Sequence, residues 1–204
     1  VNILESGLFF RLDASNVLKE NIASIIMPIG IDHKDFLKNG TIDEIIYEKC
    51  SHLLNGSRII IARQKSEVLS KIKKRINLNT SKKIFFGKEF DYKKIDNRFL
   101  YKDNLGSINL PTPNLLGDFQ LDNVTTAIAT VRNLSQFNIT SKHLKKSIVK
   151  IRSEGRLQKI TKGNLRNYVS KKNQIIIDGA HNPLAASVVI KYLDSFENKK
   201  EIFM

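Results

Sequence analysis

Residues 175–187 read IIIDGAHNPLAAS and decide how the C-terminal part of the chain is built. The apolar run over residues 174–177 is short, rich in isoleucine and typical of a buried strand. A Gly-Ala-His-Asn turn follows, and Pro183 suits the first turn of a helix, where its missing N–H costs nothing. Asp178 and His181 therefore stand between the end of a strand and the start of a helix, whose free N–H groups favour anions.

Working outward, further strand-like runs rich in isoleucine and valine alternate with segments of helical period. This alternation predicts an α/β fold with a largely parallel sheet. A polar, aromatic-spaced stretch over residues 90–110 predicts small strands or a hairpin at the sheet edge, and helices are expected over residues 117–134 and 141–151. The strand-like runs cover residues 1–4, 23–29, 58–62, 83–86 and 174–177.

A domain boundary is expected near the Ser-Glu-Gly turn at residues 153–155, because a new strand-loop-helix unit begins after it. The predicted domains are residues 1–153 and 154–204. The chain opens at a residue other than Met that reads as mid-strand, and EIFM at residues 201–204 reads as the opening of another strand. An internal fragment of a longer protein is the resulting expectation.

Composition favours a soluble, cytoplasmic protein with no membrane partner. The chain has 204 residues, 41% hydrophobic and 26% charged, with no apolar run near the roughly 20 residues that a membrane helix needs. Its single cysteine, Cys50, excludes an internal disulfide and a cysteine zinc cluster. The net charge of +14 permits a nucleic-acid surface, but the lysines are scattered, so a compositional bias is favoured and no nucleic-acid partner is expected.

The segment TIDEIIYEKCSHLL, residues 41–54, predicts a helix with one lysine out of place. Thr41 followed by Glu44 is the capping-box pattern that satisfies the first free N–H groups. The apolar stripe starting at Ile42 would place an apolar residue seven positions on, where Lys49 stands. Burial would lower the pKa of Lys49 and free its amine for chemistry. The alternative is that Lys49 snorkels to the edge of the stripe.

Five stretches, in order and spacing, resemble the folylpolyglutamate synthase/dihydrofolate synthase family of Mur-type ATP-dependent amide ligases. The match runs from Glu5 to Ala186, and five collinear motifs make a chance resemblance improbable. The stretches are ESGLFFRLDASN (residues 5–16), PIGIDHKDFLKNGTIDEIIYEK (28–49), LLGDFQLDNVTTAIAT (115–130), EGRLQ (154–158) and IDGAHNPLAA (177–186).

The resemblance implies a Mur ligase-like central ATPase domain followed by the start of a Rossmann-like C-terminal domain. The phosphate loop G-x-x-x-x-G-K-[ST] of the family is missing from these residues, so the fragment alone is expected to be inactive. The implied reaction transfers the γ-phosphoryl group of ATP to the carboxylate of a folate or dihydropteroate, and the amine of L-glutamate then attacks the acyl phosphate. A monomer is expected.

By the same resemblance, Glu5 and His33 are expected to bind Mg²⁺. A hard cation prefers oxygen ligands, so Glu5 follows from chemistry as well, whereas His33 depends on the family match. Lys49 corresponds to a lysine that is carbamylated in the family and helps hold a second Mg²⁺. The sequence continues Cys-Ser-His after Lys49, where the family usually has Ala-Gly-Ile.

The loop RLDASN resembles a loop beside the folate site, so Arg11, Asp13 and Asn16 are expected to shape that site. Asp32, next to the predicted metal ligand, is expected to contact the pterin. Residues 9 and 10 are Phe-Phe where the family has Gly-Gly, which replaces a permissive backbone pair with two bulky rings.

For ATP, the resemblance implies adenine recognition by Asn123, with Gln120 about one turn before it. Arg156 would reach the phosphates, although an interdomain salt bridge is the alternative role. Asp178 would bond the ribose or hold water, and His181 would face the phosphates and, with Lys49, act catalytically. ATP would then bind between two domains, so that domain closure completes the site.

Three alternatives remain open. Another Mur-type ligase, acting on a cell-wall precursor, would share most of the machinery. A basic nucleic-acid-binding module would bind DNA or RNA in a strongly salt-dependent way and would tolerate mutation of Lys49 or His181. A noncatalytic relative is suggested by the phenylalanine pair and by the altered residues after Lys49.

Overall fold

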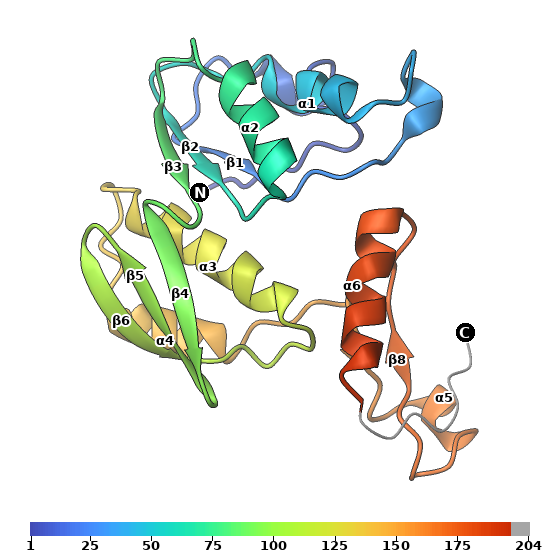
Figure 1. The fold of residues 1–204 in the computed structure, drawn as a ribbon. Coiled ribbons are helices and arrows are strands. Elements are labelled where there is room, and N and C mark those ends of the chain that lie inside the picture. Colours follow the sequence, from blue (N-terminus) through green and yellow to red (C-terminus); the bar gives the residue numbers. More distant parts are fainter. Residues whose placement is uncertain (197–204) are drawn as a thin grey trace.

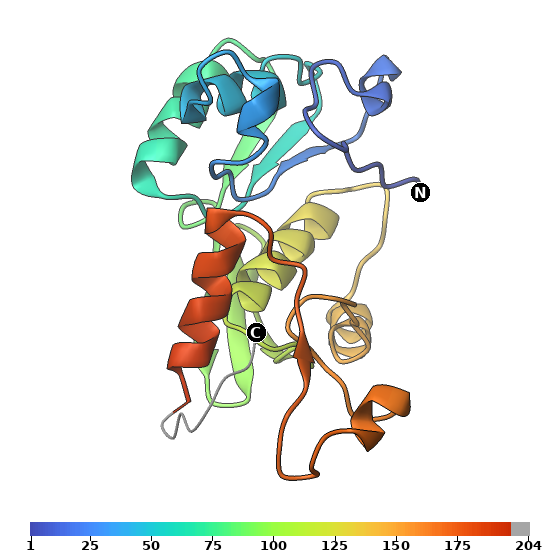
Figure 2. The ribbon, with the colours of Figure 1, turned by 90° about the vertical axis from the view of Figure 1, so that its right-hand side faces the viewer.

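The computed structural model describes residues 1–196, which form three adjoining units (Figures 1 and 2). The first unit is a parallel sheet with helices, and the second is an antiparallel meander with helices. The third unit is an antiparallel pair of short strands followed by the last helix. In this part of the chain, no helix has the length and apolar character to span a membrane.

The first unit is a three-stranded parallel sheet in the order β1-β2-β3. Its central strand alternates strictly. Ile59 and Ile61 pack with α1 and α2 on one face, and Ile60 packs toward α3 on the other. Helices therefore cover both faces of β2, as parallel sheets require. The unit contains η1 (Ala14–Val17), β1 (Ser24–Ile26), η2 (Lys34–Phe36), α1 (Ile42–Cys50), β2 (Arg58–Ile61), α2 (Ser66–Arg75) and β3 (Lys82–Phe85).

The second unit is an antiparallel three-stranded meander backed by α3 and α4. Phe99, Tyr101 and Leu110 on its inner face are fully buried, and they share one core with Ile128 of α3. This core also reaches Ile60 of β2, so the meander and the parallel sheet are built around α3. The elements are β4 (Phe90–Ile95), β5 (Arg98–Asp103), β6 (Gly106–Pro111), α3 (Phe119–Arg132) and α4 (Ser141–Ile148).

The third unit contains β7 (Gln158–Lys159), α5 (Asn164–Asn167), β8 (Ile176–Ile177) and α6 (Pro183–Asp194). The first turn of α6 points toward the parallel-sheet unit (Figures 1 and 2). Asn182 caps this helix by accepting from the Ala185 N–H at 2.8 Å, and Pro183 occupies its first turn. The helix therefore begins where the sequence pattern predicts.

The parallel arrangement is confirmed only for β1, β2 and β3. The stretch over residues 90–110 forms a separate antiparallel sheet, and β7 pairs with β8 antiparallel. The expectation of a largely parallel sheet is therefore confirmed in part: β1, β2 and β3 form a parallel sheet, and the stretch expected at its edge forms a sheet of its own. The predicted strand over residues 1–4 is wrong, since these residues are exposed and adopt no regular structure.

The capping box on α1 is confirmed, with the Thr41 side chain accepting from the Glu44 N–H and the Glu44 carboxylate accepting from the Thr41 N–H. The helices expected over residues 117–134 and 141–151 are confirmed as α3 and α4 with shorter ends. The strand expected at residues 201–204 lies outside the described residues. The domain boundary near residue 153 and the Rossmann-like character of the C-terminal domain stay predictions.

Candidate functional site

The predicted substrate loop is held together by its own polar residues. Asp13 accepts from the backbone N–H groups of Ser15 and Gly7, both at 2.8 Å, and Asn16 donates to the Arg11 carbonyl at 3.0 Å. Hydrogen bonds from the Ser15 hydroxyl and N–H, and then from the Gly7 N–H, hold the pKa of Asp13 below its usual value. Three predicted site residues are thus gathered in one ordered turn.

Arg11 anchors this loop to α1. Its Nε lies 3.0 and 2.9 Å from the two carboxylate oxygens of Glu48, and its backbone N–H donates to the Glu48 carbonyl at 2.9 Å. The hydrogen bond and the charge of Glu48 raise the pKa of Arg11, so the guanidinium stays charged. The Arg11 guanidinium also lies 5.7 Å from the ring centre of Tyr47. Glu48 and Tyr47 thus hold Arg11, and the sequence did not single them out.

Lys49 is half-buried and faces the same loop from α1. Its Nζ donates to the Leu8 carbonyl at 3.2 Å and lies 5.7 Å from the ring centre of Phe9. An ammonium group is stabilised by both a carbonyl oxygen and an aromatic face. Phe9, one of the two rings that replace the family glycines, therefore packs directly against the lysine.

Phe9 also contacts His33. The two rings meet edge to face with centroids 6.1 Å apart. His33 adopts a left-handed backbone conformation, with φ of 51°, at the start of η2, and its Nε2 lies 3.5 Å from Asp32 Oδ2. A left-handed conformation is uncommon for a residue other than glycine.

The predicted metal ligands are not assembled in the described conformation. Glu5 is exposed on the N-terminal segment, while Lys49 and His33 both border the ring of Phe9. Within residues 1–196, no group of three or more His, Cys, Asp or Glu side chains is arranged to hold a metal ion. The residues as placed do not fit a metal centre, and the Mg²⁺ and carbamate assignments stay predictions.

The predicted phosphate-facing residues do come together in the third unit. Asp178 Oδ2 accepts from the Leu157 N–H at 2.7 Å, and the Gly179 N–H donates to the Gly155 carbonyl at 2.8 Å. A methyl group placed on Gly179 would lie 2.8 Å from a terminal nitrogen of Arg156. The turn that carries Arg156 is therefore fixed directly against the Asp178-Gly179 turn.

His181 lies next to these residues and also reaches the first unit. Its Nδ1 lies 2.9 Å from the Gly179 carbonyl, and its Nε2 lies 3.9 Å from Asp32 Oδ2. Asn182, which the sequence did not single out, donates from Nδ2 to the same Asp32 oxygen at 2.9 Å. The residue before a proline at a helix start is a common cap, and that pattern is the signal by which Asn182 could have been noticed.

The predicted adenine residue Asn123 lies on α3. Its Nδ2 donates to Gln120 Oε1 at 3.2 Å, so the two residues act as one pair a turn apart. Beside them, Arg63 pairs with Asp122 at 3.0 Å and lies 4.0 Å from the ring centre of Phe86. Arg63 follows β2, and its position next to the predicted adenine residue was not foreseen.

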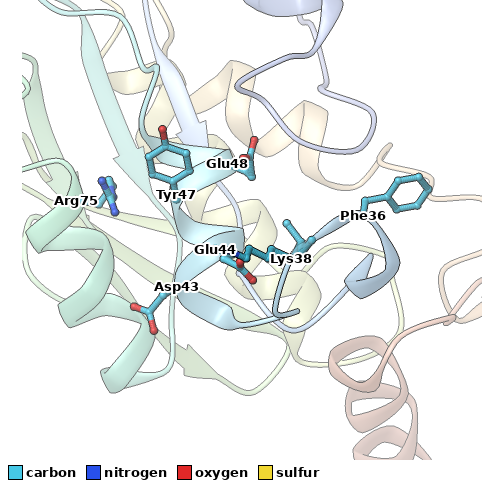
Figure 3. A pocket seen from close by; sticks show the side chains of 8 residues that line it. Phe36, Lys38, Asp43, Glu44, Tyr47, Glu48 and Arg75 are labelled. Atoms are coloured by element: carbon cyan, nitrogen blue, oxygen red, sulfur yellow. The ribbon is translucent and has the colours of Figure 1, made fainter.

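A hollow of about 460 Å³ lies between η2, α1 and the end of α2 (Figure 3). The guanidinium of Arg75 lies 4.9 Å from the ring centre of Tyr47 on its wall. None of the predicted site residues lines this hollow, although Arg11 reaches its edge through Glu48. Its lining residues are Phe36, Leu37, Lys38, Asp43, Glu44, Tyr47, Glu48 and Arg75.

The chain has sequence relatives over nearly its whole length. No family model matches the chain. It is 31% identical over 206 residues to the dihydrofolate synthase/folylpolyglutamate synthase of Buchnera aphidicola subsp. Schizaphis graminum, covering 98% of the chain and 44% of that protein. It is 29% identical over 197 residues to a probable dihydrofolate synthetase of Schizosaccharomyces pombe, covering 96% and 45%.

Among solved structures, Escherichia coli FolC in complex with DHPP and ADP superposes with a TM-score of 0.77 at 25% identity, covering 95% of the chain and 42% of that structure. The fold is thus a mixed α/β fold that matches part of this structure. The chain is similar over nearly its whole length to dihydrofolate synthase/folylpolyglutamate synthase proteins, and it spans a little under half the length of the relatives it matches.

Proposed function

We propose that the protein carrying this chain ligates L-glutamate to the carboxylate of a folate or dihydropteroate at the expense of ATP, in the cytoplasm, through an acyl-phosphate intermediate. The observation that carries the proposal is the contact of His181 and Asn182, from the DGAHNP stretch, with Asp32 of the IDH stretch. These stretches lie about 150 positions apart, and an amide ligase needs nucleotide and acceptor groups at one place.

In this proposal, Arg156 and His181 receive the phosphates, and Asp178 holds the turn that presents them. Asp178 accepts from the Leu157 N–H, next to Arg156, so that removing its carboxylate would release the Arg156 turn. Charge spreads over the phosphoryl oxygens during transfer, and oriented cationic donors stabilise it most effectively. Asn123, positioned by Gln120, would recognise the adenine.

The substrate loop supplies the acceptor side. Arg11 is held by Glu48, Asp13 and Asn16 shape the turn, and all three belong to the loop that contacts Lys49 through Leu8 and Phe9. The family resemblance names Glu5, His33 and a carbamylated Lys49 as Mg²⁺ ligands, but these residues as placed do not form a metal centre. No step of the proposed reaction is therefore assigned to a metal.

The test uses the natural protein that carries this chain and a folate labelled with ¹⁸O in its carboxylate. An acyl phosphate requires one labelled oxygen to leave with the phosphate when glutamate attacks. We expect one ¹⁸O per inorganic phosphate released, together with a glutamylated folate. Lys49→Ala is expected to abolish the transfer, and full activity of this variant would remove Lys49 from the mechanism.

A relative without catalysis is the second candidate, favoured by the packing of Phe9 against Lys49. It predicts that ATP and folate bind without forming ADP. Binding of ATP and folate with no phosphate release would support this candidate, whereas release of unlabelled phosphate would contradict an acyl-phosphate intermediate.

A further inference from the structure

We propose that Asp32 is a positioning residue that docks the first turn of α6 onto the parallel-sheet unit through Asn182, rather than a pterin contact. The Asp32–Asn182 hydrogen bond of 2.9 Å joins residues 150 positions apart. It connects the loop after β1 with the cap of α6, and so connects the acceptor side with the phosphate-facing residues. The part of this inference that concerns ATP rests on the proposed function.

Asn182 is used twice, which fixes its orientation. Its Oδ1 accepts from the Ala185 N–H at 2.8 Å and caps α6, while its Nδ2 donates to Asp32. An amide group can do both because its oxygen and nitrogen lie on opposite arms. The direction of the first turn of α6 is thus set by the position of the Asp32 carboxylate.

The carboxylate of Asp32 is committed to the protein on both oxygens. Oδ1 accepts from the His33 N–H at 2.9 Å, and Oδ2 accepts from Asn182. Nε2 of His33 and Nε2 of His181 lie 3.5 and 3.9 Å from the same Oδ2. Asp32 therefore brings together one imidazole from each unit, an arrangement that a ligand contact would not require.

Close packing at the neighbouring position supports the same docking. A Cβ added to Gly30 would lie 2.9 Å from Cβ of Leu184, which is closer than real contacts allow. The Gly30 backbone thus lies directly against the Leu184 side chain in the first turn of α6, where a side chain on residue 30 would not fit. Two adjacent contacts, one polar and one steric, define a single docking point.

The first experiment exchanges the donor and the acceptor of the Asp32–Asn182 hydrogen bond and measures the distance between α6 and the parallel-sheet unit. Asn182→Asp keeps an oxygen that can cap α6 but replaces the donor with a second carboxylate, so it should undock the helix. The double variant Asp32→Asn, Asn182→Asp exchanges donor and acceptor and should restore the hydrogen bond. Spin labels on cysteines at Leu78 and Ile190, 92% and 56% exposed, report the distance between the units. Cys50 is buried and would not compete for the label.

We expect a single narrow distribution of label-to-label distances when only the two labels are present. Asn182→Asp should give a broader distribution at longer distances, and the double variant should return to the original distance. A parent-like distribution in Asn182→Asp, or a double variant as broad as the single one, would overturn the docking role.

The second experiment separates positioning from pterin binding in the natural protein that carries the chain. Undocking moves His181 and Arg156 away from the acceptor side, so Asn182→Asp should raise the KM for ATP about tenfold and change the KM for the folate less than twofold. A change confined to the folate KM would overturn the assignment. A protein with no ATP-dependent ligation at all would refute the proposed function, while the distance measurement would still decide the docking.

Discussion

Arg132 and Asp103 form a buried, two-point ion pair between α3 and the end of β5. Nε of Arg132 lies 2.6 Å from Oδ2 of Asp103, and a terminal nitrogen lies 2.9 Å from Oδ1. The Asp103 side chain is 1% exposed and also accepts from the Tyr101 hydroxyl at 3.0 Å and the Leu105 N–H at 2.9 Å. This pair joins the meander to the helix that carries the predicted adenine residue.

Because of this ion pair, the free energy of unfolding should decrease at acidic pH. Burial opposes ionisation of Asp103, but the hydrogen bonds from Arg132, Leu105 and Tyr101 outweigh it and hold the pKa of Asp103 below its usual value. A depressed folded-state pKa stabilises the fold above the unfolded-state pKa, and this stabilisation is lost as the pH falls through the folded-state pKa. Urea unfolding at several pH values should therefore show the free energy of unfolding falling below about pH 4.

Asp103→Asn should cost about 3–5 kcal/mol, because it leaves a buried guanidinium without its counter-charge. It should also flatten the acid dependence. The matched control is Asp118→Asn, since Asp118 pairs with Lys94 at 3.0 Å but is 65% exposed. This control should change the free energy of unfolding by less than about 1 kcal/mol. Equal effects of the two variants would contradict the assignment.

Thr41→Ala should destabilise α1 by about 1 kcal/mol, because it removes the acceptor for the Glu44 N–H. The hydrogen bond from the Thr41 N–H, followed by the hydrogen bonds from Asn39, holds the pKa of Glu44 below its usual value against the opposing effect of burial. Thr41→Ser keeps the hydroxyl and serves as the control. Denaturant midpoints of the three proteins measure the difference. If Thr41→Ser were as unstable as Thr41→Ala, the hydroxyl would not stabilise α1 as a cap.

Gly30→Ala should loosen α6 without unfolding the parallel sheet. The new methyl group would meet Leu184 at 2.9 Å, so one of the two segments has to move. Amide hydrogen exchange should rise in the first turn of α6 and stay unchanged in β2. Gly7→Ala is a suitable comparison, because a methyl group there would meet only Asp13 Oδ2, at 3.6 Å. Unchanged exchange in α6 would show that the close approach does not hold the helix.

Phe9→Gly should make Lys49 more reactive. The ring of Phe9 lies 5.7 Å from Nζ, and its removal opens one side of the ammonium group. Mass spectrometry after brief acetylation should show a several-fold faster modification of Lys49 in this variant. Phe10→Gly is the matched control, since the contacts described for Lys49 involve Leu8 and Phe9. An equal rate in both variants would rule out shielding by Phe9.

The sequence was most informative where local chemistry is strong. The capping box at Thr41 and the strand-turn-helix unit whose helix begins at Pro183 depend on neighbouring residues, and both are present. Which strands pair is a non-local property, and apolar alternation alone does not distinguish the parallel β1–β3 sheet from the antiparallel meander. The strand expected over residues 1–4 failed for the same reason, since an apolar run forms a strand only beside a partner.

The site was predicted unevenly for a similar reason. The EGRLQ and IDGAHNPLAA stretches predicted Arg156, Asp178 and His181 as site residues, and the structure places them together. The links made by Glu48 to Arg11 and by Asn182 to Asp32 join distant segments, and no local pattern specifies them. The effect of Phe9 on Lys49 likewise depends on a side chain from another element, so spacing along α1 could not reveal it.

The central claim is that this chain forms part of an ATP-dependent ligase for a folate carboxylate and glutamate. Its most direct test is ADP release by the natural protein that carries the chain, measured with folate and glutamate together and with each omitted. We expect sustained ADP release, matched by glutamylated product, only when both are present. ADP release that is indifferent to the folate, or no release with both substrates present, would contradict it.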